Sequence, residues 1–296
     1  QEVVRNPELH ALIRATLAGS PATESDIVRH GSEDRFFQAR GARLRGADGK
    51  DAGALIVLNE VTRMYKLERV RRDFVANVSH ELRTPITSIQ GFAESLRENP
   101  IGDPEERKRF LEIILRQSRR LNAIIEDLLN LARIEDQAQE KQLPLGRAPL
   151  QPVLQSAIQA CQSQAEAKRI AVRLDCPPDL QAALHAELLE RAVINLIDNA
   201  LKYSVAGTAI SVAAAIQGDR MQIRVSDQGC GISAEHLPRV FERFYRVDKA
   251  RSRKLGGTGL GLAIVKHIAL AHHGTALVES THAQGSTFTI DLPSPA

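Results

Sequence analysis

The apolar residues of one long segment recur at helical spacing on a face too wide for a single helical neighbour. One stripe repeats at alternating spacings of four and three residues and is apolar at every position except Gln117: Phe110, Ile114, Gln117, Leu121, Ile124, Leu128 and Leu131. A second stripe lies beside it: Leu111, Leu115, Ser118, Ile125, Leu129 and Ala132. Because one helix of the same chain cannot cover both stripes, we expect a helical hairpin over 64–137 that pairs with a second copy as a four-helix bundle.

Length and composition indicate a multidomain globular chain. It has 296 residues, 43% of them hydrophobic, which is enough for two or three domains. A net charge of +3 is too small and too dispersed to indicate a nucleic-acid partner, and the basic cluster at 69–72 is interpreted as a solvated helix face. The scattered cysteines, Cys161, Cys176 and Cys230, favour a reducing compartment without disulfides.

No apolar run approaches the roughly 20 residues that a membrane-spanning helix needs. Because the chain begins at Gln1 rather than Met, we expect a fragment whose upstream part, with a membrane anchor, is missing.

The first 63 residues predict one helix and one strand pair. Helical spacing covers 6–19, and two strand-like runs flank a turn at Asp48-Gly49 within 35–62. That core is too small to stand alone, so we interpret 1–63 as the carboxy-terminal part of a larger sensor module.

Residues 138–149 are polar with Pro and Gly and predict a linker, after which the pattern becomes mixed. Helices are predicted at 150–168, 185–203 and 261–273, with strands at 170–177, around 209–216, at 222–227, and in a final pair near 275–292. Residues 150–296 therefore predict one layered helix-and-sheet domain.

Unusual chemistry gathers in this last domain. Asn195, Asn199 and Lys202 share one face of an otherwise apolar helix, which by itself is equally explained by structural amides with ordinary partners. Two further elements favour a ligand: Asp-Gln-Gly-Cys-Gly-Ile at 227–232 ends a strand, and the glycine-rich 256–261 runs into a helix. Such a loop lets backbone N–H groups approach phosphates.

These elements resemble the ATP-binding domain shared by sensor histidine kinases and the GHKL ATPases. Asn-Leu-Ile-Asp-Asn-Ala-Leu-Lys-Tyr-Ser is similar to the N box, 227–232 to the G1 box, Phe-Glu-Arg-Phe-Tyr-Arg at 241–246 to the F box, and 256–262 to the G2 box. The resemblance implies an α/β-sandwich domain that binds ATP and Mg²⁺.

It also implies a role for each matching residue. Asn195 and Asn199 would hold Mg²⁺, Lys202 would meet phosphate, Tyr203 would border the nucleotide, and Asp227 would accept the adenine amino hydrogen. The glycines and the residue between them would shape the nucleotide loops: Gly229, Gly231, Gly257, Gly259, Leu260 and Gly261. Residues 233–256 would be a lid, with Arg243 or Arg246 reaching the γ-phosphate.

Upstream, Phe-Val-Ala-Asn-Val-Ser-His-Glu-Leu-Arg-Thr-Pro resembles the H box of two-component histidine kinases. A neutral imidazole is a competent nucleophile, so His80 would accept the phosphoryl group and pass it to an aspartate of a response-regulator receiver domain. Glu81 would assist the attacking imidazole, and Thr84 would orient the water that dephosphorylates the regulator. The alternative for Thr84 is a bond back to its own helix carbonyl, and Pro85 predicts a bend there.

The amino-terminal part resembles the later half of a PAS domain, and with the H box it is similar to the phosphate-regulon sensor kinases. The implied fold class is multidomain α+β: a partial PAS-like α/β segment, a dimeric helical hairpin and a GHKL sandwich. The implied setting is the cytoplasmic portion of a bacterial sensor kinase anchored in the inner membrane. The early PAS strands are absent, so no sensor ligand follows from the sequence.

Two other classes compete with this interpretation. A GHKL ATPase of the gyrase or MutL kind, or an anti-sigma serine kinase, shares the nucleotide boxes but lacks an H box on a helical hairpin. A scaffold that dimerises without turnover is the other, and the presence of every expected catalytic residue type argues against it.

Overall fold

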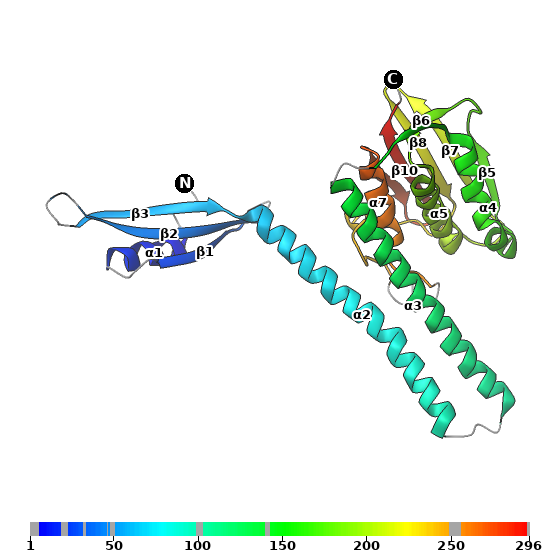
Figure 1. The fold of residues 1–296 in the computed structure, drawn as a ribbon, viewed down its shortest axis with the longest axis horizontal. Helices are drawn as coiled ribbons and strands as arrows, with labels where there is room; N and C mark the ends of the chain where they lie inside the picture. Colours follow the sequence, from blue (N-terminus) through cyan, green and yellow to red (C-terminus); the bar gives the residue numbers. More distant parts are fainter. Residues whose placement is uncertain are drawn as a thin grey trace. The chain divides into compact units, whose positions relative to one another are not determined.

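The computed structural model describes residues 6–18, 23–31, 34–45, 47, 51–98, 103–139, 143–248 and 256–294. The chain divides into two compact units, 1–79 and 80–296 (Figure 1). Within the described ranges we find no helix with the length and hydropathy of a membrane span.

The first unit contains a short helix on a three-stranded sheet. Helix α1 (Pro7–Leu17) begins at Asn6, whose side chain accepts the backbone N–H of Glu8 at 2.8 Å. Strands β1 (Thr23–Arg29), β2 (Arg35–Arg45) and β3 (Asp51–Glu60) are antiparallel in the order β1-β2-β3. Leu9, Leu12, Ile27 and Ala39 form the core between helix and sheet. The predicted helix and strand pair are confirmed, and the turn at Asp48-Gly49 lies outside the described residues.

Strand β1 was not predicted from the sequence. Its residues are mostly polar, and Ile27 is the buried apolar residue that it gives to the core. An edge strand of this composition shows no period-two pattern. One helix and three strands do not establish a PAS domain, so that assignment stays a prediction.

Helix α2 (Thr62–Glu98) and helix α3 (Pro104–Gln139) are the long helices of the predicted hairpin. In the second unit, Phe92 of α2 packs edge-on against Phe110 of α3, with ring centroids 4.9 Å apart. The Asp103 side chain accepts the Glu105 N–H at 3.0 Å at the start of α3. Along α3 the second apolar stripe is exposed: Leu111, Leu115, Ile125 and Leu129.

The expected linker at 138–149 is shorter than predicted. Helix α3 continues to Gln139, and β4 (Gly146–Pro149) pairs antiparallel with β6 (Gln181–Leu184). Polar composition with Pro and Gly predicted a linker there, but an edge strand can also accommodate proline.

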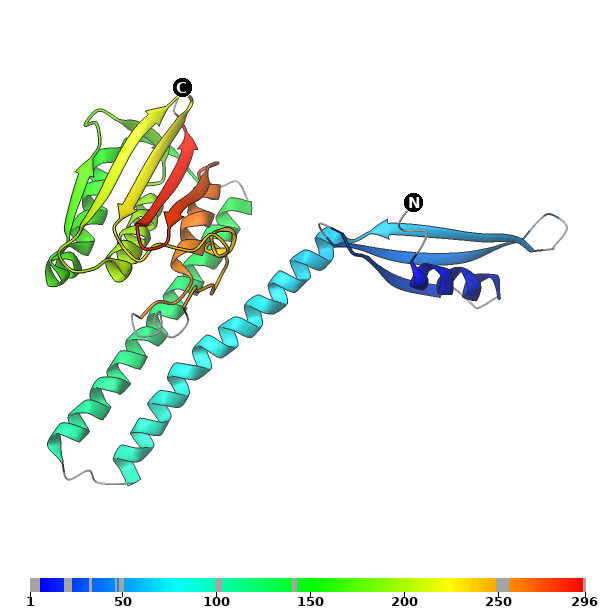
Figure 2. The same ribbon diagram turned by 180° about the vertical axis from the view of Figure 1, so that it is seen from behind.

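The carboxy-terminal part is a layer of helices on one mixed sheet. Its strands are β5 (Ala171–Asp175), β7 (Ala209–Gln217), β8 (Arg220–Asp227), β9 (Thr275–Thr281) and β10 (Gly285–Pro293), in the order β5-β7-β8-β10-β9. The β5–β7 pair is parallel and the others are antiparallel. Figure 2 shows the sheet in front, with α4 (Leu150–Lys168), α5 (Ala186–Tyr203) and α7 (Gly261–Ala271) behind it.

The core lies between these helices and the sheet. Apolar residues of α5, α7 and the central strands are almost fully buried, including Leu189, Val193, Ile197, Ile210, Ile223, Ile264 and Ile268. Leu131 and Ile134 of α3 belong to the same core, where α3 packs beside α7. The end of the hairpin therefore contributes to the carboxy-terminal domain.

A buried histidine connects the end of α7 to the residue that precedes α5. Nε2 of His272, at the end of α7, accepts the backbone N–H of His185 at 3.0 Å, and its Nδ1 lies 2.8 Å from the Ile268 carbonyl oxygen. Because Nε2 is an acceptor, the ring is neutral with its proton on Nδ1. Burial lowers the pKa of His272 below its ordinary value, with a further decrease from His185 and His273.

We expect this ring to make the chain less stable in acid. In the unfolded chain it is protonated near a pH of about 6.5, whereas the folded ring stays neutral to lower pH. The free energy of unfolding should therefore be unaffected above that pH and fall below it by about 1.4 kcal/mol per pH unit, until the folded pKa is reached. Urea unfolding at about pH 7.5 and about pH 5.5 measures the loss.

His272→Gln is the comparison, because its amide oxygen can still accept the His185 N–H but cannot be protonated. The variant should lose less stability over that interval than the wild-type chain. An equal loss in the two chains would show that His272 is not the responsible group.

Candidate functional site

A cavity of about 490 Å³ lies among α3, α5, the turn after β8 and the loop before α7. Many of the residues predicted for nucleotide binding line it: Asn195, Asn199, Lys202, Tyr203, Asp227, Gly231, Arg246, Gly257, Gly259 and Gly261. Segments far apart in the sequence thus meet where the resemblance placed a nucleotide.

Helix α5 presents its polar face to this cavity. Asn195 and Asn199 lie one turn apart, and Lys202 pairs with Asp198 at 2.5 Å. Among the described residues the Asn195 side-chain nitrogen is buried without a hydrogen-bond partner. A Cβ built on Gly261 would lie 3.3 Å from the Asn195 side-chain oxygen, so glycine keeps the space beside that amide open. The amide oxygens of Asn195 and Asn199 are a suitable donor set for Mg²⁺.

Asp227 ends β8 and faces the same cavity. Its Oδ1 accepts the Gly229 N–H at 2.7 Å, which positions the carboxyl group although Gly229 itself does not line the cavity. Burial raises the pKa of Asp227 above its ordinary value, and the backbone hydrogen bonds from Gly229 and Ser286 oppose that increase. The following turn requires glycine at Gly231, where φ is +63° and a Cβ would lie 2.0 Å from a backbone oxygen.

The two candidate arginines of the F box separate in the structure. Arg246 lines the cavity, but Arg243 pairs with Glu135 of α3 and is not among the lining residues. His267 of α7 lies 3.2 Å from the same Glu135 oxygen, and burial, with the charges of Arg243 and Lys266, lowers the pKa of His267 to about 4. The His267 ring is therefore neutral where it lies beside Glu135. In this arrangement Arg243 joins the domain to α3.

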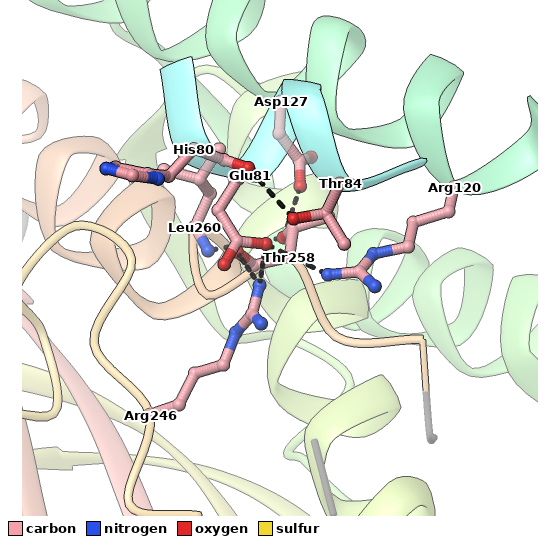
Figure 3. Close-up of polar contacts among 8 residues, drawn as sticks. All are labelled: His80, Glu81, Thr84, Arg120, Asp127, Arg246, Thr258 and Leu260. Atoms are coloured by element: carbon pink, nitrogen blue, oxygen red, sulfur yellow. Dashed lines mark hydrogen bonds and ion pairs between the residues drawn. The ribbon is translucent and has the colours of Figure 1, made fainter. Parts of the chain in front are cut away.

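The H box lies along α2 beside an open groove of about 460 Å³. His80, Arg83 and Thr84 line this groove together with Thr87 and Ser88. The Thr84 hydroxyl donates to the His80 carbonyl oxygen at 3.1 Å (Figure 3). That is the helix-internal bond anticipated as the alternative for Thr84.

Glu81 is held by two arginines from different parts of the unit. Its Oε2 lies 2.9 Å from Nη2 of Arg120 on α3 and 3.0 Å from Nη2 of Arg246 in the F box (Figure 3). The two arginine side chains are 10% and 4% exposed, so the three side chains form a nearly buried cluster. The residue next to the candidate acceptor is thereby connected to the cavity.

Several polar residues of the cavity were not predicted from the sequence, among them Asp127, Asp198 and Thr258. Asp198 lies four residues before Lys202, an ion-pair spacing that could have been recognised. Thr258 lies inside the G2 box, among the glycines that were predicted to shape this loop. Asp127 comes from α3, and no pattern in the sequence relates that helix to the glycine loop.

Comparisons with known proteins agree with this geometry. Residues 70–137 match the His Kinase A (phospho-acceptor) domain, and residues 184–296 match the family described as histidine kinase-, DNA gyrase B-, and HSP90-like ATPase. The chain is 39% identical over 240 residues to the sensor-like histidine kinase SenX3 of Mycolicibacterium smegmatis, covering 81% of this chain and 62% of that one. It is 35% identical to the sensor protein SrrB of Staphylococcus aureus over 83% of this chain and 42% of the relative. The chain thus spans less than two thirds of the length of these relatives.

Solved structures give the same result. The histidine kinase AdeS of Acinetobacter baumannii aligns with a TM-score of 0.58 at 28% identity, over 73% of this chain and 98% of that one. The histidine kinase ThkA, solved with the response regulator TrrA, aligns with a TM-score of 0.60 over 99% of this chain and 86% of that one, which at 21% identity shows likeness of fold. With a phospho-acceptor domain followed by an ATPase domain of this kind, the chain belongs to the two-component sensor histidine kinases.

Proposed function

We propose that this chain is an ATP-dependent protein kinase that phosphorylates its own His80 and passes the phosphoryl group to an aspartate of a response regulator. The observation that supports this most directly is the cluster in which Glu81, beside His80, contacts Arg246 of the cavity that is lined by Asn195, Asn199 and Asp227. His80 and the candidate nucleotide site thus lie in one compact unit.

ATP is the proposed substrate of the cavity. Asp227 would accept a hydrogen bond from the adenine amino group, and Tyr203 would border the base. Asn195 and Asn199 would hold Mg²⁺, which when bound neutralises phosphate charge. Lys202 and Arg246 would contact the phosphates, since both are cations that line the cavity.

In the proposed reaction, a ring nitrogen of His80 attacks the γ-phosphorus of ATP. An N–P bond forms, the bond from phosphorus to the β,γ-bridging oxygen breaks, and ADP leaves. The imidazole proton passes to Glu81. Arg120 and Arg246 both donate to Oε2 of Glu81 in this structure, and we propose that these contacts are released when Glu81 takes the proton.

We also propose that the chain works as a homodimer. The exposed stripe of α3, with Leu115 and Leu129 both more than half exposed, would be buried in a four-helix bundle. The proposal extends to a receiver-domain partner, to phosphate sensing through an amino-terminal sensor, and to an anchor in the inner membrane, as the resemblance of the sequence implies.

A second proposed activity is removal of the phosphoryl group from the regulator. Thr84 lines the same groove as His80, one turn away, so its hydroxyl could orient a water near a docked phosphoaspartate. To do so it must exchange its bond to the His80 carbonyl for one to that water.

The first test is the chemistry of the label. Incubation with Mg-ATP should give a phosphorylated chain whose label is lost in acid and kept in base, because a nitrogen nucleophile forms a phosphoramidate. His80→Gln should reduce the label to background, whereas His10→Gln, on α1, should leave it unchanged. A stoichiometric label that survives in the His80 variant would contradict the assignment.

The second test concerns the metal. Asn199→Ala removes one proposed ligand and should weaken Mg²⁺-dependent binding of a non-hydrolysable ATP analogue at least about tenfold, the lower end for partners that only orient a metal ligand. Isothermal titration with Mg²⁺ and with a chelator separates metal-dependent affinity from the rest.

Asn130→Ala is the matched control, because the Asn130 amide bonds back to the Glu126 carbonyl on α3 and lies outside the cavity. An unchanged Mg²⁺ dependence in the Asn199 variant would place the metal elsewhere.

The third test separates the two activities. Thr84→Ala should keep the rate of autophosphorylation within about twofold. It should slow the loss of phosphate from the regulator by about tenfold or more, because the hydroxyl that would position the attacking water is removed. Ser95→Ala is the control, since the Ser95 hydroxyl also bonds back to a carbonyl of α2 at 2.9 Å. Wild-type dephosphorylation, or an equal loss of both activities, would reject the proposed role of Thr84.

A further inference from the structure

The hydroxyl and the carbonyl oxygen of Thr258, in the glycine loop, are both engaged. The Thr258 hydroxyl donates to Oδ2 of Asp127 on α3 at 2.8 Å and accepts the Leu260 N–H at 3.2 Å. Its carbonyl oxygen accepts from Nη2 of Arg246 at 2.6 Å. The loop is therefore held from the helical hairpin on one side and from the F box on the other (Figure 3).

Arg246 is engaged in the same way. The Nη2 atom that contacts Thr258 also donates to Oε2 of Glu81 at 3.0 Å. The side chain is 4% exposed, yet its Nε is buried without an acceptor among the described residues. A buried guanidinium donor without an acceptor is costly, so the site has unused capacity for an anion.

These contacts lie in the candidate nucleotide cavity. Asp127, Arg246 and Thr258 line it together with Asn199 and Lys202, the residues proposed for the metal and the phosphates. Two carboxylates of the hairpin, Asp127 and Glu81, thus take donors at the phosphate end of the cavity.

A carboxylate and a phosphate need the same partners. Both accept from hydroxyl, backbone N–H and guanidinium donors, and charge-assisted bonds of this kind are the strong ones. Asp127 is largely enclosed: burial raises its pKa, while the Thr258 hydroxyl and the charge of Arg191, 3.9 Å away, oppose that increase. Displacing this acceptor from Thr258 would free the hydroxyl for another anion.

We propose that Asp127, together with Glu81, is a built-in competitor for the polyphosphate of the nucleotide. While these carboxylates hold Thr258 and Arg246, the donors for the phosphates are occupied; when a nucleotide takes the donors, the hairpin is released and Glu81 becomes available beside His80. Coupling of this kind is reciprocal, so removing the competitor tightens nucleotide binding. The inference rests on the proposed binding of ATP.

The test compares two ligands on the full chain. Asp127→Asn keeps the shape of the side chain and removes its charge, so the affinity for a non-hydrolysable ATP analogue should rise at least about fivefold, the lower end of coupling between linked sites. The affinity for adenosine, which has no phosphate, should stay within about twofold, because Asp127 competes only with anions. Isothermal titration measures both dissociation constants.

Glu126→Gln is the matched control. Glu126 is exposed, precedes Asp127 on α3 and carries the same charge, but it does not line the cavity. This variant should change the affinity for the ATP analogue and the affinity for adenosine by no more than about twofold, the same limit as for adenosine with Asp127→Asn. Equal tightening by the two variants would reduce the effect to general electrostatics and overturn the proposal.

Other outcomes are equally decisive. Unchanged or weaker binding of the ATP analogue by Asp127→Asn, while the wild-type chain binds it normally, overturns the competition alone. Equal tightening for adenosine shows a change of cavity shape and overturns it too. If the wild-type chain binds neither ligand, the proposed function fails with it.

A measurement on the wild-type chain tests the same competition even if the Asp127 variant does not fold. The ATP analogue, but not adenosine, should speed hydrogen exchange of the α3 amides at 123–134, because the hairpin loses its contacts to Thr258 and Arg246. No change in exchange with bound ATP analogue would overturn the proposal.

Discussion

A single carboxylate oxygen keeps two buried guanidinium groups in place. Oε2 of Glu81 lies within 3.0 Å of both Arg120 and Arg246 and supplies the negative charge that favours enclosing these two cations. Moving the acceptor helix away from the F box would leave buried cations without their counter-ion, which costs several kcal/mol per ion by typical values. The position of the H box relative to the glycine loop in this arrangement is therefore controlled by electrostatics at one residue.

Apolar packing brings that cluster together. Leu131 and Ile134 of α3 are each 2% exposed and are buried in the core formed by α5, α7 and the sheet. From residue 80 onward the hairpin is consequently part of the unit 80–296 and not an appendage of it. Polar contacts then add specificity: Glu135 receives Arg243 and His267, and Asp127 receives Thr258.

Local patterns predicted most of the fold and most of the cavity. Helical spacing located α2 to α5 and α7 within a few residues, and the N, G1 and G2 boxes identified the lining residues on α5 and the two glycine turns. Local patterns failed where a segment's role depends on a distant partner. Strand β4 became a strand only through pairing with β6, β1 contributed mainly Ile27 to a core, and Arg243 turned to Glu135 on another helix.

The last turns of α3 pack in the core of the ATP-binding domain, although the composition of the sequence places the domain boundary after them. This difference affects how domains of such chains can be exchanged. A chimaera joined in the polar segment after residue 137 would follow the boundary that the composition suggests, and it would keep β4 and β6 in the same domain. It would also remove Leu131 and Ile134 from the core that they complete. An ATP-binding domain transferred to a foreign hairpin would need matching apolar residues in the last turns of that hairpin, so the unit of exchange includes the end of the helix.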